Sequence, residues 1–277
     1  MAVALASPFG AEELEEVPLG SGPLVRVICQ VSYPKIVDLT VPEGIGRVAA
    51  ALRQEYPVLR EERALALAIT PEGIKQTEVE GQLIWRLQDT TEVGWQVSLT
   101  PNFVSVETRL YSSRDDFLDR LRRVLQAVAT TLAPAAADRI GVRYFNRIEG
   151  PFDKGYDAIT TPFGPPLHAG LNIPLSPPTE LRHSIVDTLF KSEGAELRAR
   201  WGLVPAGTIV DPGVPPSGER TWILDIDAYT TSAGAFSADE VTERARRQAE
   251  SAHRFFRWCL TDEGLNLFRT RDGQHNE

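Results

Sequence analysis

The stretch at residues 137–150, ADRIGVRYFNRIEG, constrains the fold more than any other part of the chain. Apolar side chains alternate along it with a second set that is rich in arginine, which is typical of a β-strand with two different faces. A long helical pattern ends just before it, and a proline-rich stretch follows it. We therefore interpret it as the first strand of a second half of the chain. The apolar set is Ile140, Val142, Tyr144 and Ile148, and the other set is Arg139, Gly141, Arg143, Phe145 and Arg147.

Three segments show the 3.6-residue periodicity of long amphipathic helices. Each begins after a residue whose hydroxyl can accept a hydrogen bond from the first helical turn, as N-cap residues do. The first helix is expected after Thr40 and before Pro57, the second between Ser113 and Pro134, and the third after Ser237, where Glu240 completes a capping box, with a final short turn after Thr261.

Short β-branched and aromatic segments fill most of the rest, and the glycines and prolines between them predict antiparallel strands joined by turns. The stretch 151–179 contains seven prolines and no long periodic pattern, which favours an irregular surface segment. The segment 211–220, DPGVPPSGER, is expected to be a mobile loop. Besides the strand within 137–150, the expected strands cover residues 24–36, 63–70, 81–88, 95–100, 103–110, 181–191, 195–204 and 221–230.

The order of these elements predicts an α+β fold, with a curved, largely antiparallel sheet and long helices on one of its faces. Residues 23–136 and 137–268 are expected to be two pseudo-repeated halves of strand, helix, strands and helix, because in each a last strand leads into a capped helix. Residues 1–22 are expected to form a lead-in and residues 269–277 a tail. In topology alone the plan resembles the saddle of the TATA-binding protein, and this analogy implies nothing about function.

The composition excludes some classes of function. The 277-residue chain has a formal net charge of −9, which argues against bulk nucleic-acid binding, because phosphate neutralisation needs a basic surface. No apolar run approaches the roughly 20 residues of a membrane helix, and the first residues lack the pattern of a secretory signal. We therefore expect a cytoplasmic protein.

The metal-binding and redox residues show no functional spacing. Cys29 and Cys259 lie in apolar patterns and are expected to be core thiols, although the sequence leaves a disulfide open. The four histidines are scattered, so we expect no metal site and no cofactor.

Several segments are structural in character and lie along nearly the whole chain: RVICQVSYP (26–34), Tyr56 with Pro57, RIGVRYFNRI (139–148), WILDIDAY (222–229), and a helix with His253 and Phe256 that leads into LTDEGL (260–265). In these segments the chain resembles a bacterial protein family of about this length that is patchily distributed among genomes. That family carries no accepted catalytic residues, so the resemblance implies no mechanism. Its patchy occurrence implies a neighbourhood of mobile-element or defence-type genes.

Three pairs of charged residues are the candidate binding residues. Spacings of two or four residues on a strand place both members of a pair on one face. In one interpretation the arginines and aspartates form ion pairs across the sheet, which fix strand register and surface charge. In the other, the guanidinium groups bind phosphate in an anion or nucleotide pocket, or the carboxylates hold Mg²⁺. The pairs are Arg143 with Arg147, Arg198 with Arg200, and Asp225 with Asp227, and we favour the ion pairs.

Asn146 is a further candidate, because it lies on the otherwise apolar face of its strand. Its amide either satisfies an irregular backbone or points into a ligand pocket.

The sequence contains no recognisable catalytic constellation, such as a GxSxG elbow, a phosphate-binding glycine loop or an HExxH helix. This, the acidic charge and the proline-rich stretch favour a non-enzymatic protein that binds another protein or assembles as a homo-oligomer. The alternative is a nucleotide- or RNA-processing enzyme that uses Asp225 and Asp227 with the arginines.

Overall fold

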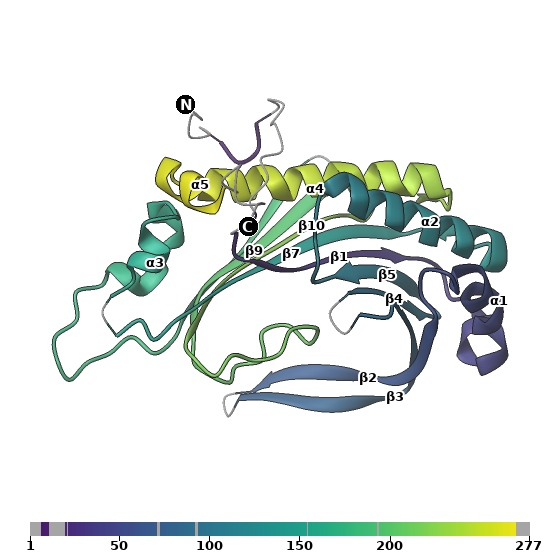
Figure 1. The fold of residues 1–277 in the computed structure, drawn as a ribbon, viewed down its shortest axis with the longest axis horizontal. Helices are drawn as coiled ribbons and strands as arrows, with labels where there is room; N and C mark the ends of the chain where they lie inside the picture. Colours follow the sequence, from purple (N-terminus) through teal and green to yellow (C-terminus); the bar gives the residue numbers. More distant parts are fainter. Residues whose placement is uncertain are drawn as a thin grey trace, which may run out of the picture.

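A nine-stranded antiparallel sheet forms the body of the computed structural model, with the long helices on one face (Figure 1). The structure describes residues 7–10, 20, 22–70, 73–91, 94–153, 155–192 and 194–269, without the side chains of residues 63–82. The predicted α+β class and antiparallel sheet are confirmed. Across the sheet, the strands are β2 (Val58–Thr70), β3 (Gly73–Gln88), β4 (Trp95–Thr100), β5 (Phe103–Thr108), β1 (Leu24–Ser32), β7 (Arg139–Glu149), β10 (Thr221–Thr230), β9 (Ala195–Val204) and β8 (Ser184–Ser192).

The strand β7, which was expected to open the second half, lies between β1 and β10 in the middle of the sheet. Its alternation divides as predicted. Ile140 and Val142 are buried in the core beneath the helices, whereas Arg143 on the other face pairs with carboxylates. We call the sheet face away from the helices the polar face.

The helices cover the sheet through the apolar stripes that the sequence indicates. α2 (Arg114–Leu132) and α4 (Ala238–Cys259) lie side by side over the sheet, and α1 (Pro42–Leu52) lies at one end of it (Figure 1). The predicted caps of the two longer helices are confirmed, because Ser113 Oγ accepts a hydrogen bond from Asp116 N and Ser237 Oγ accepts one from Glu240 N. Thr261 caps α5 (Asp262–Phe268) in the same way.

The cap predicted for the first helix is wrong. Thr40 ends a short 3₁₀ helix, η1 (Val37–Thr40), and its hydroxyl donates to Val37 O at 2.7 Å. The residue that precedes α1 is Val41, which has no side-chain oxygen to cap it. The additional turn of η1 therefore moves the N-cap position of α1 by one residue, from the expected Thr40 to Val41.

The proline-rich stretch is more ordered than its composition indicates. It contains α3 (Asp157–Thr160), η2 (Pro165–Leu167) and η3 (Ala169–Asn172). Its Phe163 ring packs on Trp222 of β10, with the ring centroids 4.5 Å apart. The stretch thus packs against the sheet and the end of α4 through its apolar residues. These residues are spaced too widely to form a periodic pattern in the sequence.

The remaining elements are small. β6 (Ala136–Ala137) and β11 (Gly234–Ala235) form a separate two-stranded sheet. Cys29 and Cys259 are buried free thiols, and burial raises the pKa of Cys29 to about 12. Most of the expected lead-in and tail lies outside the described residues. Within the described part of the chain, no helix combines the length and apolar character needed to cross a membrane.

Candidate functional site

Arginines and carboxylates from neighbouring strands meet on the polar face, at Asp225 of β10. Strand register places Asp225 directly opposite Arg200 of β9. On β7 the residue opposite Asp225 is Phe145, and Arg143 lies two positions away on the same face. Asp225 Oδ1 accepts from Arg143 Nε at 2.5 Å, and Asp225 Oδ2 accepts from Arg143 Nη2 at 3.0 Å and from Arg200 Nη2 at 2.5 Å. Both carboxylate oxygens of this buried residue are therefore occupied by guanidinium groups.

A second carboxylate reaches the same place from the connection between β9 and β10. Asp211 is 1% exposed. Its Oδ1 accepts from Arg26 Nη1 at 2.5 Å, and its Oδ2 lies 3.0 Å from Arg143 Nη1. Arg26, on β1, also pairs with Glu107 of β5. We call this group the arginine–aspartate cluster; it comprises Arg26, Glu107, Arg143, Arg200, Asp211 and Asp225.

The cluster fastens the loop 205–220 to the polar face, beneath the sheet in Figure 1. Val214 packs in a small apolar group with Phe145 and Ile223, and Arg147 Nη1 donates to Pro215 O at 2.7 Å. The expectation of a mobile loop does not fit this packing. Turn-forming residues made the segment look exposed, whereas the buried Asp211 and Val214 attach it to the sheet.

The other predicted residues have separate partners. Asp227 Oδ2 accepts from Arg139 Nη2 at 2.9 Å. Arg198 donates to both oxygens of Asp187 on β8, at 2.8 and 2.5 Å, and Arg147 pairs with Glu149 at 2.7 Å. The structure thus joins Arg143, Arg200 and Asp225 in one cluster and places Arg147, Arg198 and Asp227 in neighbouring ion pairs.

Asn146 satisfies backbone. Its Nδ2 donates to Leu224 O on β10 at 2.9 Å, and the residue is buried. Its partner on β1 is Leu24, where the register shifts between Leu24 and Arg26. The structure therefore gives this amide a backbone partner, but that carbonyl lies on β10, whose pairing with β7 is regular, and not at the irregular register of β1.

The electrostatics of the face favour the charged form of Arg143 but disfavour that of Asp227. Burial alone would lower the pKa of Arg143, but the Asp225 and Asp211 carboxylates raise it above its ordinary value. Burial raises the pKa of Asp227, and Arg139 and Arg143 oppose this shift. The three guanidinium groups and three carboxylates of the cluster cancel formally.

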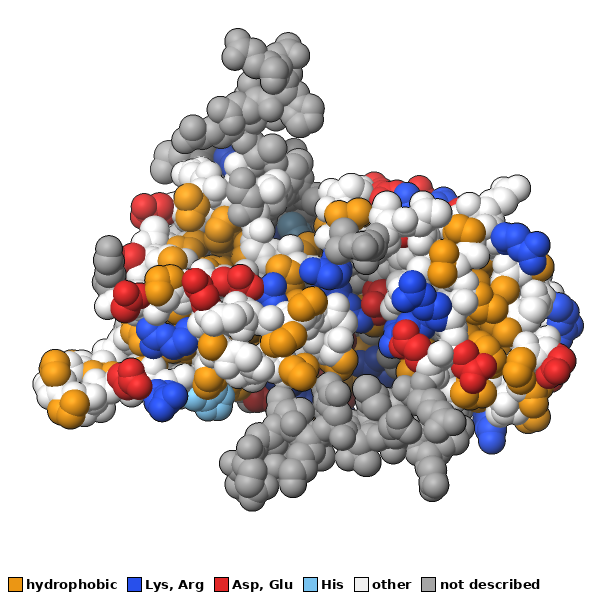
Figure 2. Space-filling model, turned by 60° about the horizontal axis from the view of Figure 1, so that its bottom comes forward, with side chains coloured by type: hydrophobic (Ala, Val, Ile, Leu, Met, Phe, Trp, Pro, Cys, Tyr) orange, Lys and Arg blue, Asp and Glu red, His pale blue; other side chains and the backbone are white. Residues whose placement is uncertain are grey.

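This pairing limits the chemistry available to the cluster. A metal ion at Asp225 would have to displace guanidinium groups from both oxygens. Among the described residues, no group of three or more His, Cys, Asp or Glu side chains is placed to hold a metal. Figure 2 shows acidic and basic side chains interspersed over this side of the molecule. The cluster is therefore suited to joining β1, β5, β7, β9, β10 and the loop.

Sequence reasoning missed Arg26, Glu107 and Asp211. Arg26 carried a usable signal, because it is a charged residue within the apolar strand RVICQV. Asp211 carried no such signal, because an aspartate before Pro-Gly indicates only a turn. The structure contains that turn, in which Gly213 N donates to Asp211 Oδ1 at 2.7 Å.

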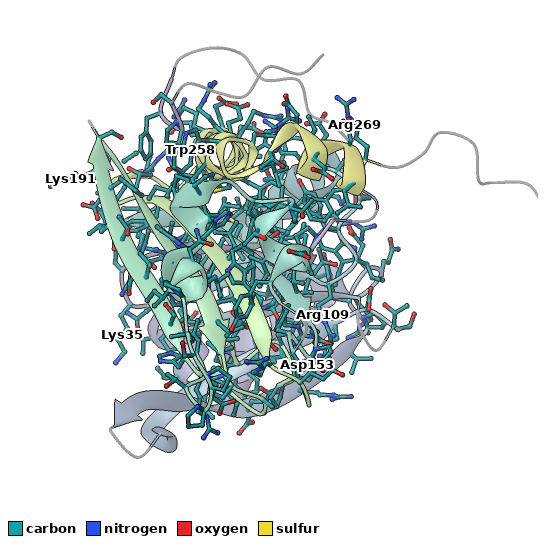
Figure 3. All side chains as sticks on the ribbon, turned by 90° about the vertical axis from the view of Figure 1, so that its left-hand side faces the viewer. Lys35, Arg109, Asp153, Lys191, Trp258 and Arg269 are labelled. Atoms are coloured by element: carbon teal, nitrogen blue, oxygen red, sulfur yellow. The ribbon has the colours of Figure 1, made fainter. Side chains whose placement is uncertain are left out.

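A second candidate site is the sheet edge formed by β8, which pairs only with β9 among the described strands and lies opposite the other edge strand, β2. Within the described residues, no backbone hydrogen bond reaches β8 from its other side. Ile185 and Leu189 are 37% and 56% exposed. Figure 3 shows this strand at the margin of the sheet, with Lys191 near its end.

No protein-family model matches the chain, and a search of curated proteins also found no match.

Proposed function

We propose that this protein is a non-enzymatic binding protein that joins another protein chain, or a second copy of itself, through the β8 edge. The observation that carries the proposal is a nine-residue edge strand with aliphatic side chains exposed on one face. An edge strand presents unpaired N–H and C=O groups, which an added strand can satisfy.

The side chains of β8 support binding at this edge. Ile185 and Leu189 are four residues apart on one strand, so they point to the same face. Covering them removes apolar surface from water, which is worth roughly 25 cal/mol per Å². Backbone pairing would thus fix the orientation of the added strand, and the two aliphatic side chains would supply much of the free energy of binding.

The state of the arginine–aspartate cluster supports a binding role over an enzymatic one. Its carboxylates are engaged by guanidinium groups, so the chain offers no free base or nucleophile there. The alternative, a nucleotide- or RNA-processing enzyme, requires these ion pairs to open. A thermal-shift screen with nucleotides and Mg²⁺ tests it, and the binding proposal predicts no ligand-dependent rise in melting temperature.

The remaining parts of the proposal concern ancestry and context. We propose that β1 and β7 begin two related halves of the chain, because the two strands are neighbours at the centre of the sheet and each half ends in a capped helix. The resemblance to the TATA-binding protein is an analogy of topology alone. The resemblance to the patchily distributed bacterial family supports an accessory role beside mobile-element or defence genes. Two free buried thiols are compatible with a cytoplasmic location.

An edge-blocking variant tests the binding role. Leu189→Lys places a charge on the exposed edge, which disfavours strand addition. Leu267→Lys is the matched control, because Leu267 on α5 is 58% exposed. Tagged wild type, co-expressed with untagged chain in native lysate, should retain bound protein. Leu189→Lys should lose it and Leu267→Lys should keep it; equal retention by all three would contradict the proposal.

A further inference from the structure

We propose that the β8 edge binds a second copy of this chain, antiparallel, across a two-fold axis at Leu189. This inference rests on the binding role proposed above and adds the partner and the register. When a strand pairs antiparallel with its own copy, residues equally spaced on either side of the axis lie opposite each other. An axis at Leu189 places Asp187 opposite Lys191 of the second copy, and Lys191 opposite its Asp187.

The charges of β8 favour this register. Charged side chains on an edge strand commonly prevent association. Here they have opposite signs and lie symmetrically about Leu189, so that self-pairing brings unlike charges together on one face. An axis shifted to Thr188 would instead place Lys191 opposite Ile185 and leave Asp187 opposite Leu189. Only the first register makes both charged positions complementary.

Both charged groups are accessible for such pairing. The Lys191 side chain is 79% exposed, and its Nζ lies 4.0 Å from Glu196 Oε1. The Asp187 side chain is 39% exposed and pairs with Arg198. In the proposed dimer, Asp187 lies between Arg198 of its own chain and Lys191 of the second copy, so one carboxylate serves two cations.

The apolar side chains of β8 also match across the axis. Leu189 meets its own copy at the centre of one face, and Thr188 lies opposite Phe190 on the other. Phe190 is already part of an aromatic group on the helix side, with its ring centroid 5.7 Å from that of Phe255. Self-pairing therefore covers the exposed Leu189 and extends a face that is already packed.

Cysteine cross-linking tests the axis directly. The native Cys29 and Cys259 are buried, so they compete little with a thiol introduced on the edge. Directly opposite residues have Cα atoms about 4.5–5.5 Å apart, which is within reach of a disulfide. Leu189→Cys should form a disulfide-linked dimer under mild oxidation. Ile185→Cys is the matched control on the same face, because its Cα would lie on the order of 27 Å from its copy.

Equal cross-linking of both variants, or cross-linking of Thr188→Cys in place of Leu189→Cys, would overturn the inference. A charge reversal gives a second measurement, because Lys191→Glu should raise the dimer Kd about tenfold or more by setting like charges opposite each other. Lys35→Glu, at another exposed lysine (Figure 3), should leave Kd unchanged. If Leu189→Cys does not cross-link while binding stays sensitive to Leu189→Lys, self-pairing is wrong and the edge binds another protein.

Discussion

At the scale of single residues, the location of an ion pair decides what it contributes. Asp225 and Asp187 lie on the polar face, and each binds arginine through both oxygens. Asp225 is buried, whereas the Asp187 side chain is 39% exposed. Water replaces a lost partner at an exposed pair but not at a buried one. The two aspartates therefore form a matched comparison.

Asp225→Asn should lower the free energy of unfolding by about 1–3 kcal/mol, because it leaves Arg143 and Arg200 without their shared anion. Asp187→Asn should lower it by less than about 1 kcal/mol. Urea unfolding measures both. Equal losses would show that burial does not determine the contribution of these pairs.

Asp227 should affect stability in a direction set by its raised pKa. The folded protein binds this proton more tightly than the unfolded chain, since burial raises the pKa above the ordinary 3.8. As pH rises from the ordinary to the folded-state pKa, the folded state therefore loses stability relative to the unfolded state. Asp227→Asn removes this titration. As pH rises through that window, the free energy of unfolding of Asp227→Asn should increase relative to that of wild type, and at higher pH the two should change in parallel. A relative decrease would contradict the raised pKa of Asp227.

The alternation of residues on β7, β9 and β10 supported the prediction that arginines and aspartates meet on one face. The partners of each residue could not be predicted. The ion pair of Arg26 with Asp211 joins residues 185 positions apart, and it depends on strand order and on the path of a loop. Neither leaves a local pattern in the sequence.

At the scale of elements, capped helices and alternating strands were predicted well because their signals are local. Ser113 and Ser237 mark helix starts through hydroxyls that bond within the same turn. The helices of the proline-rich stretch were missed because their stability comes from distant packing, such as that of Phe163 on Trp222. The same holds for the loop 205–220.

The attachment of that loop can be tested at Gly213. A Cβ at this position would lie 2.4 Å from the Arg26 guanidinium carbon, which is fixed by two carboxylates. Gly213→Ala should therefore displace the loop, lower stability by about 1 kcal/mol or more and speed proteolysis within 205–220. Gly218→Ala is the control, since no atom lies within 4 Å of its Cβ position. Equal cleavage of both variants would show that the close approach to Arg26 does not hold the loop.

At the scale of the whole molecule, the two candidate sites have different consequences. The arginine–aspartate cluster is self-neutralised and internal, so it connects elements within one chain. At the β8 edge, backbone groups without a partner strand in the described sheet lie beside the exposed aliphatic side chains of Ile185 and Leu189. We therefore propose the edge as the binding surface and assign a structural role to the cluster.

Hydrogen–deuterium exchange of the β8 amides tests pairing of this edge with a second copy most directly. We expect a peptide that covers residues 184–192 to exchange more slowly in concentrated than in hundredfold-diluted wild-type protein, because pairing protects its outward N–H groups. Leu189→Lys should exchange rapidly at both concentrations. Exchange in β8 that is independent of concentration and identical in wild type and Leu189→Lys would contradict the account.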